Sequence, residues 1–82
     1  MTDSDLVRAY AVRVYVKPAR ARKQKKFSVR SGDVHAALGF DNRFPLVCGA
    51  LGTQKFRREN GLKLLLLDGP TQGASTVLTF GL

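Results

Sequence analysis

The chain has 82 residues, 44% of them hydrophobic, which suits one small folded domain and is too apolar for a wholly disordered chain. Its 14 Lys and Arg against 6 Asp and Glu give a formal net charge of +8, which favours a polyanionic partner. A single cysteine excludes an internal disulfide, and the longest apolar run, Leu64 to Leu67, is far shorter than the roughly 20 residues of a membrane-spanning helix.

The N-terminal residues and the lone Cys48 indicate the compartment. The opening stretch MTDSDLV is acidic and lacks the apolar core of a secretory signal. A single thiol is typical of a reducing environment. We therefore expect a cytoplasmic protein without a membrane partner, associated with the nucleoid. We expect one domain over residues 1–82, with residues 1–4 frayed.

The positive charge is concentrated between Arg8 and Arg30, where nine basic residues occur without an acidic one. Such a run is typical of a nucleic-acid-binding surface, although a basic face that serves only solubility is the alternative. A membrane-surface helix is disfavoured, because PARARKQKK has no bulky apolar residues among its basic ones. The predicted phosphate contacts in this region are Lys17, Arg20, Arg22, Lys23, Lys25, Lys26 and Arg30.

Residues 5–16, DLVRAYAVRVYV, fit two secondary structures. As a helix, the segment has an apolar stripe of Leu6, Tyr10 and Val14, to which Val7 and Ala11 can be added. The alternating valines of its second half instead suit a strand. Capping residues in the acidic stretch ahead favour the helix. Pro18 then either kinks this helix or begins a second short one. The alternation in residues 26–30 predicts a brief strand.

Two short helices are predicted next. Ser31 or Asp33 caps the first, which ends at Gly39. Asp41-Asn42 caps the second, and Pro45 suits its first turn, where a missing N–H costs nothing. The apolar faces of the two helices are Val34, Ala37 and Leu38 in the first, and Phe44, Val47, Cys48 and Leu51 in the second.

The rest of the chain is predicted to form one further turn and a hairpin. Gly52 ends the second helix, Thr53 caps the turn QKFRREN, and Gly61 closes it. Residues 62–67 and 75–80 are strand-like runs joined by the turn-rich segment DGPTQGA. Phe56 is expected in the core and not as a platform for base stacking.

The order of helix, short strand, helix, turn, helix and two-stranded hairpin resembles that of the winged helix-turn-helix superfamily, from about Asp5 to the C-terminus. The resemblance implies an α+β fold in which a recognition helix at about 42–55 enters the major groove. Asn42 and Arg43 would then face base edges. Many winged helices carry a basic wing tip, but DGPTQGAS has an acid and no base, so the resemblance does not extend to minor-groove contact by a charged wing.

Polar and basic residues beyond Leu51 extend this surface. Gln54, Lys55, Arg57 and Arg58 continue it on the further turn, although a solvated helix end explains them nearly as well. Polar wing residues such as Gln72 are able to bind phosphates. The candidates that we select from this part of the chain are Thr53, Gln54, Lys55 and Gln72.

These patterns predict a protein that binds double-stranded DNA, either as a transcriptional regulator or as an architectural factor with little sequence preference. RNA binding through residues 17–26 is one alternative. A winged-helix protein-interaction module is another. The leucines of 62–67 suggest burial on both faces and therefore a homodimer.

No catalytic, cofactor or metal site is predicted. His35 is expected at the surface beside a helix cap, and Cys48 as a small buried hydrophobe. No third residue orients them as a catalytic pair, and one Cys with one His does not make a structural zinc site.

Overall fold

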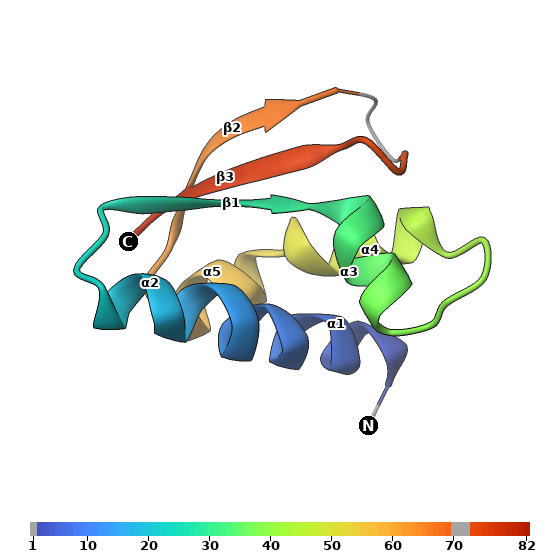
Figure 1. The fold of residues 1–82 in the computed structure, drawn as a ribbon, viewed down its shortest axis with the longest axis horizontal. Coiled ribbons are helices and arrows are strands. Elements are labelled where there is room, and N and C mark those ends of the chain that lie inside the picture. Colours follow the sequence, from blue (N-terminus) through green and yellow to red (C-terminus); the bar gives the residue numbers. More distant parts are fainter. Residues whose placement is uncertain (1, 70–72) are drawn as a thin grey trace.

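The computed structural model describes residues 2–69 and 73–82. Its α+β fold has helices on one face of a three-stranded antiparallel sheet (Figure 1). The chain begins with a long helical segment composed of α1 (Asp3–Ala11), a π-helical stretch (Val12–Val16) and α2 (Lys17–Ala21). The helix expected here is confirmed, and the alternative strand is wrong.

A capping box starts α1. The hydroxyl of Thr2 accepts a hydrogen bond from the Asp5 N–H at 3.1 Å, and the Asp5 carboxylate accepts one from the Thr2 N–H at 3.2 Å. These two bonds satisfy N–H groups that the helix itself leaves without partners. Asp3 and Ser4, which we expected to be frayed, are the first helical residues.

Pro18 explains the π-helical stretch. Proline has no N–H and its ring clashes with the carbonyl four residues earlier, so a regular α-helix is disturbed just before it. The Lys17 N–H instead bonds to the carbonyl of Val12, five residues back. The wider turn moves the buried stripe, which consists of Val7, Ala11, Val16 and Ala19. The predicted stripe is confirmed at Val7 and Ala11 but wrong at Leu6 and Val14, because the last two side chains are exposed.

The sheet has the strand order β1-β3-β2, formed by β1 (Lys26–Arg30), β2 (Lys63–Asp68) and β3 (Val77–Gly81). Both pairings are antiparallel, and β2 has a bulge at Leu65. The predicted strand at 26–30 and the C-terminal hairpin are therefore confirmed, with each hairpin strand starting slightly later than expected. The predicted contact Gln72 lies outside the described residues.

Three short helices connect β1 to β2: α3 (Ser31–Ala37), α4 (Phe44–Leu51) and α5 (Gln54–Asn60). The predicted helix over 42–55 is therefore two helices, because the chain leaves the helix at Gly52 and Thr53 begins the next one. The predicted cap of α3 by Ser31 or Asp33 is wrong, because Arg30 is the N-cap and makes no side-chain cap bond. The predicted cap at Asp41-Asn42 is also wrong. Arg43 is the N-cap of α4, without a side-chain bond, and Asn42 has a left-handed φ of 52°.

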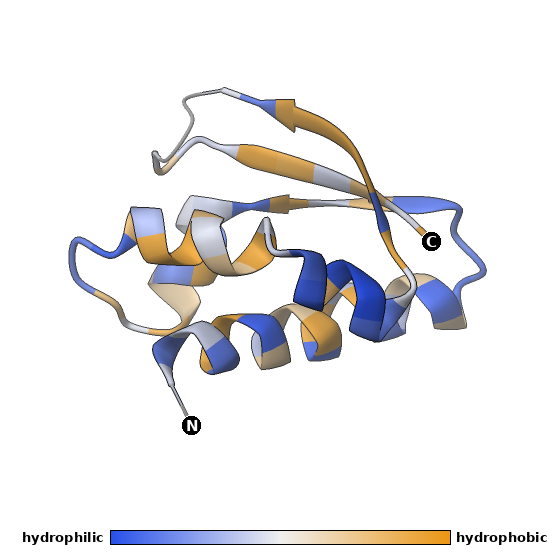
Figure 2. Cartoon of the chain, turned by 180° about the vertical axis from the view of Figure 1, so that it is seen from behind, coloured by the Kyte–Doolittle hydropathy of each residue, from blue (hydrophilic) through white to orange (hydrophobic). Residues whose placement is uncertain are grey.

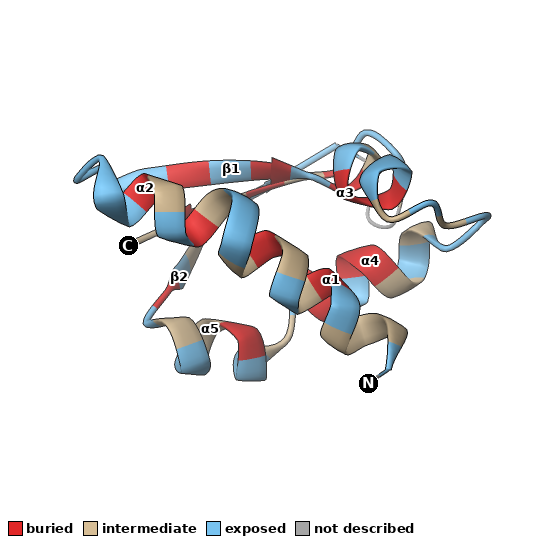
Figure 3. Cartoon of the chain, turned by 60° about the horizontal axis from the view of Figure 1, so that its bottom comes forward, coloured by how far each residue is buried: buried red, intermediate tan, exposed pale blue. Residues whose placement is uncertain are grey.

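The hydrophobic core lies between the sheet and the helices. Phe27 and Phe80 project from the sheet, and their rings are 5.5 Å apart. Phe56 of α5 meets Phe80 edge-on at the same centroid distance. Figure 3 marks buried residues on α1, α4, α5 and β1, the elements that enclose this core. Phe56 is completely buried, as predicted.

Candidate nucleic-acid interface

At one end of the molecule, three arginines form ion pairs with aspartates. This end contains the start of α1, α3 and the loop before α4 (Figure 1). The ion pairs there are Arg8–Asp5 at 2.8 Å, Arg43–Asp3 at 3.0 Å and Arg30–Asp33 at 3.8 Å. The hydrogen bond from Arg8, followed by those from Thr2, lowers the pKa of Asp5 to about 2. We call this region the paired end.

The opposite end is basic and has no such pairing. Within residues 2–69 and 73–82, the other 11 Lys and Arg residues have no acidic group within 4.0 Å. Most of them occupy α2, the turn into β1, α5 and the first residue of β2. Figure 2 shows hydrophilic residues concentrated on α5 and on that turn. We call this region the basic end; its basic residues are Lys17, Arg20, Arg22, Lys23, Lys25, Lys26, Lys55, Arg57, Arg58 and Lys63.

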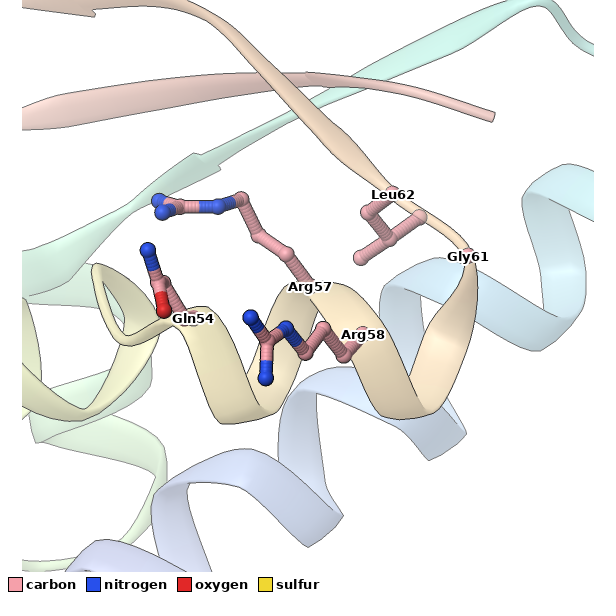
Figure 4. A pocket seen from close by; sticks show the side chains of 5 residues that line it. All are labelled: Gln54, Arg57, Arg58, Gly61 and Leu62. Atoms are coloured by element: carbon pink, nitrogen blue, oxygen red, sulfur yellow. The ribbon is translucent and has the colours of Figure 1, made fainter.

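A hollow of about 370 Å³ opens beside α5 at the basic end. Its lining has two guanidinium groups and an amide but no carboxylate, and consists of Gln54, Arg57, Arg58, Gly61 and Leu62. Figure 4 shows the side chains of Arg57 and Arg58 extending back toward the start of α5, where Gln54 lies. Arg57 also donates a hydrogen bond to the Gly52 carbonyl at 3.2 Å. The hollow therefore offers several donors and net positive charge.

Local sequence fixes α5 at both ends. The Thr53 hydroxyl accepts a hydrogen bond from the Phe56 N–H at 3.3 Å and donates one to the Ala50 carbonyl at 2.9 Å. Gly61 ends the helix with a left-handed φ of 62°, which glycine adopts without strain. The predicted caps at Thr53 and Gly61 are confirmed. The Thr53 hydroxyl is thus used within the fold, although it was selected as a nucleic-acid contact.

Arg20 connects α2 to α5. Its guanidinium donates a hydrogen bond to the carbonyl of Asn60, in the last turn of α5. A cation is also favourable there, because the C-terminal end of a helix carries partial negative charge. This bond joins the two helical parts of the basic end, so Arg20 has a structural contact beyond the phosphate contact predicted from sequence.

The residues expected to read bases lie at the paired end. The Arg43 side chain is bound to Asp3, and α4 itself contains no charged residue. The Arg43 N–H donates to Nε2 of His35 at 3.0 Å, and the His35 ring stacks on Phe44 with centroids 4.0 Å apart. His35 is therefore buried, and its expected surface position is wrong.

The structure divides the predicted contacts into two groups. Asn42, Arg43 and Arg30 belong to the paired end. The α2 segment and its following turn, with Gln54 and Lys55, belong to the basic end. Sequence reasoning placed Arg57 and Arg58 on the same surface but did not select them. The sequence signal for them is their position on the helical turn directly before the hairpin, which favours both arginines as contacts.

Further features of the described part of the chain concern metal ligands, Cys48 and membrane spans. Residues 2–69 and 73–82 contain no group of three or more His, Cys, Asp or Glu side chains arranged to hold a metal ion. Cys48 is buried, as predicted. Among the described helices, none has both the length and the apolar character needed to cross a membrane. Comparisons of the chain with protein-family models, curated proteins and solved structures gave no match.

Proposed function

We propose that this chain is a winged-helix domain that binds double-stranded DNA through its basic end. The observation that carries the proposal is the separation of charge: arginines at the paired end have aspartate partners, whereas the cations of α2, α5 and the turn into β1 have none among the described residues. Unpaired cations on one end repel each other, and a polyanion removes that repulsion.

The topology supports a winged-helix arrangement with α5 as the recognition helix. In the family's element order, the second helix of the helix-turn-helix comes directly before the hairpin. Here α5 fills that position, because only Gly61 and Leu62 separate it from β2. The helix α4 then becomes the first helix of the pair, and β2 with β3 becomes the wing.

The side chains of α5 suit this role better than those of α4. The exposed positions of α5 are Gln54, Lys55, Arg58 and Glu59, whereas those of α4 are Pro45 and Gly49. Arginine pairs with the O6 and N7 atoms of guanine, and glutamine with the N6 and N7 atoms of adenine. The basic turn after α2 supplies phosphate contacts, which set orientation without reading sequence.

The deciding experiment compares two arginine variants that change the net charge equally. We expect Arg58→Ala to weaken binding to the preferred duplex by about 1–3 kcal/mol, or roughly 5- to 150-fold, because it removes a groove contact. Arg43→Ala serves as the matched control and is expected to bind normally, because its guanidinium is already paired with Asp3. Fluorescence anisotropy with a duplex selected from a randomised pool measures both.

The same titration includes single-stranded DNA and a structured RNA at two salt concentrations. Tighter binding to duplex DNA than to the other two supports the proposal. A loss with Arg43→Ala and none with Arg58→Ala would return the recognition role to α4. Stronger binding to RNA, or no binding to any of the three, would overturn DNA binding as the function.

A further inference from the structure

The strand β2 exposes a row of large apolar side chains. Leu65, Leu66 and Leu67 are 55%, 57% and 48% exposed. Figure 2 shows β2 as a largely hydrophobic strand at the margin of the sheet. Exposed apolar side chains that are grouped in this way often mark an interaction surface, because their contact with water is unfavourable.

The backbone of β2 is open on one side. The strand order β1-β3-β2 places it at an edge, and within the described residues its only strand partner is β3. An edge strand presents N–H and C=O groups to any other strand of suitable sequence. Natural proteins usually protect such edges with charge, proline or a bulge. The strand β2 has a bulge at Leu65, but no charged residue or proline interrupts Leu64 to Leu67.

The sequence of β2 is complementary to itself in the antiparallel direction. It reads KLLLLD, with a cation at one end and an anion at the other. The bulge at Leu65 puts Lys63 and Asp68 on the same face of the sheet, because their partners in β3, Gly81 and Val77, are four residues apart. Antiparallel pairing of two copies of β2 centred at this bulge then places Lys63 opposite Asp68 at both ends of the paired strands. A parallel pairing would instead place like charges side by side, which is destabilising.

The other edge of the sheet does not have this property. The strand β1 reads KFSVR and carries a cation at each end. Two copies of β1 paired antiparallel would place Lys26 opposite Arg30, which repel. Self-association is therefore favoured at β2 and opposed at β1.

We propose that a second copy of this chain pairs with β2 in an antiparallel manner and so joins the two sheets into one of six strands. The two-fold axis of such a pair runs perpendicular to the sheet, so the helices of both copies lie on the same face. Only one short strand from each copy forms the contact, so the dimer dissociates on dilution.

Charge reversal at the ends of β2 tests this pairing. We expect Lys63→Asp alone, or Asp68→Lys alone, to raise the dimer dissociation constant about tenfold, because each places two like-charged pairs across the interface. The double variant Lys63→Asp/Asp68→Lys restores opposite charges and is expected to dimerise like the natural chain. An equimolar mixture of the two single variants is expected to form a heterodimer.

Sedimentation equilibrium over a concentration series measures these constants, and circular dichroism verifies that each variant is folded. Lys26→Asp is the matched control, because it changes charge equally on the opposite edge and is expected not to weaken the dimer. A natural chain that stays monomeric to millimolar concentration would overturn the proposal. So would a dimer that Lys63→Asp leaves intact, or that the double variant fails to restore. No nucleic acid is present, so the result is independent of the proposed function.

Discussion

Asp5 makes the stability of the start of α1 dependent on pH. Its carboxylate accepts hydrogen bonds from the Arg8 guanidinium at 2.8 Å and from the Thr2 N–H, and these lower its pKa to about 2 from an ordinary value of 3.8. A lowered pKa in the folded state means that folding favours the charged carboxylate. The resulting stability is complete above the unfolded pKa and is lost as the pH falls toward 2.

We therefore expect Asp5→Asn to reduce the free energy of unfolding at pH 6 and to flatten its decline between pH 4 and pH 2. Arg8→Ala should flatten the same decline, because the largest cause of the lowered pKa is then missing. Urea unfolding at a series of pH values measures both. A decline in Asp5→Asn as steep as in the natural chain would show that other groups control the acid transition.

His35 shows what sequence could not reveal at the scale of residues. Its position beside Asp33 on a short helix suggested a solvated side chain. Its burial depends on two partners across the following loop, the Arg43 N–H and the Phe44 ring. The loop that carries these partners has a left-handed backbone at Asn42, with a φ of 52°, a conformation uncommon for residues other than glycine although asparagine is enriched in it. Local pattern alone does not predict such a turn.

At the scale of elements, the N-cap of α5 allows the contribution of one helix end to stability to be measured. Thr53→Ala removes the hydroxyl that binds the Phe56 N–H and the Ala50 carbonyl, so we expect a loss of about 1 kcal/mol in the free energy of unfolding. Thr53→Ser keeps the hydroxyl and should retain most of that stability. Thermal or urea unfolding measures the difference.

DNA binding by Thr53→Ala, measured well below its melting temperature, should match that of the natural chain. The hydroxyl is directed into the fold and not toward the hollow, so only stability is expected to suffer. Loss of binding in a fully folded Thr53→Ala protein would place the hydroxyl among the DNA contacts after all.

The features of helices and strands that could be predicted from the sequence are those that depend on local interactions. The caps at Thr53 and Gly61 and the alternation of β1 were correctly predicted, because each depends on a few neighbouring residues, whereas the caps expected for α3 and α4 were wrong. The long helical segment was predicted too, but only the first part of its buried face, at Val7 and Ala11, was. The buried positions Ala11 and Val16 are five residues apart because the π-helical stretch lies between them. A regular helical period of 3.6 residues does not predict this spacing.

At the scale of the whole molecule, the basic turn between α2 and β1 is proposed to bind phosphates of the DNA. We expect the triple variant Arg22→Ala/Lys23→Ala/Lys25→Ala to weaken DNA binding almost equally on all duplex sequences. The slope of log affinity against log salt should fall by up to about 0.9 for each phosphate contact removed. Anisotropy titrations at four salt concentrations give the slope. An unchanged slope would mean that the turn is only solvated.

Sequence also could not show how the charges divide in space. The run from Arg8 to Arg30 appears continuous along the chain. In the fold, the long helical segment holds its 19 residues over about 28 Å, which separates the two ends of the molecule. Arg8 and Arg30 meet their aspartates at the paired end, while the residues between them form much of the basic end. The predicted recognition helix at about 42–55 crosses this division, because Arg43 is paired with Asp3 at the paired end and Lys55 has no acidic partner among the described residues.

The separation of paired and unpaired charge along a body 34 Å long gives the molecule an electric dipole in addition to its net charge. A polyanion therefore exerts a torque as well as an attraction, and the basic end turns toward it before the two surfaces touch. The same torque acts near any negatively charged support. A molecule adsorbed on a cation exchanger is thus expected to stand with α2 and α5 toward the resin, leaving the loop before α4 accessible to a protease or an antibody.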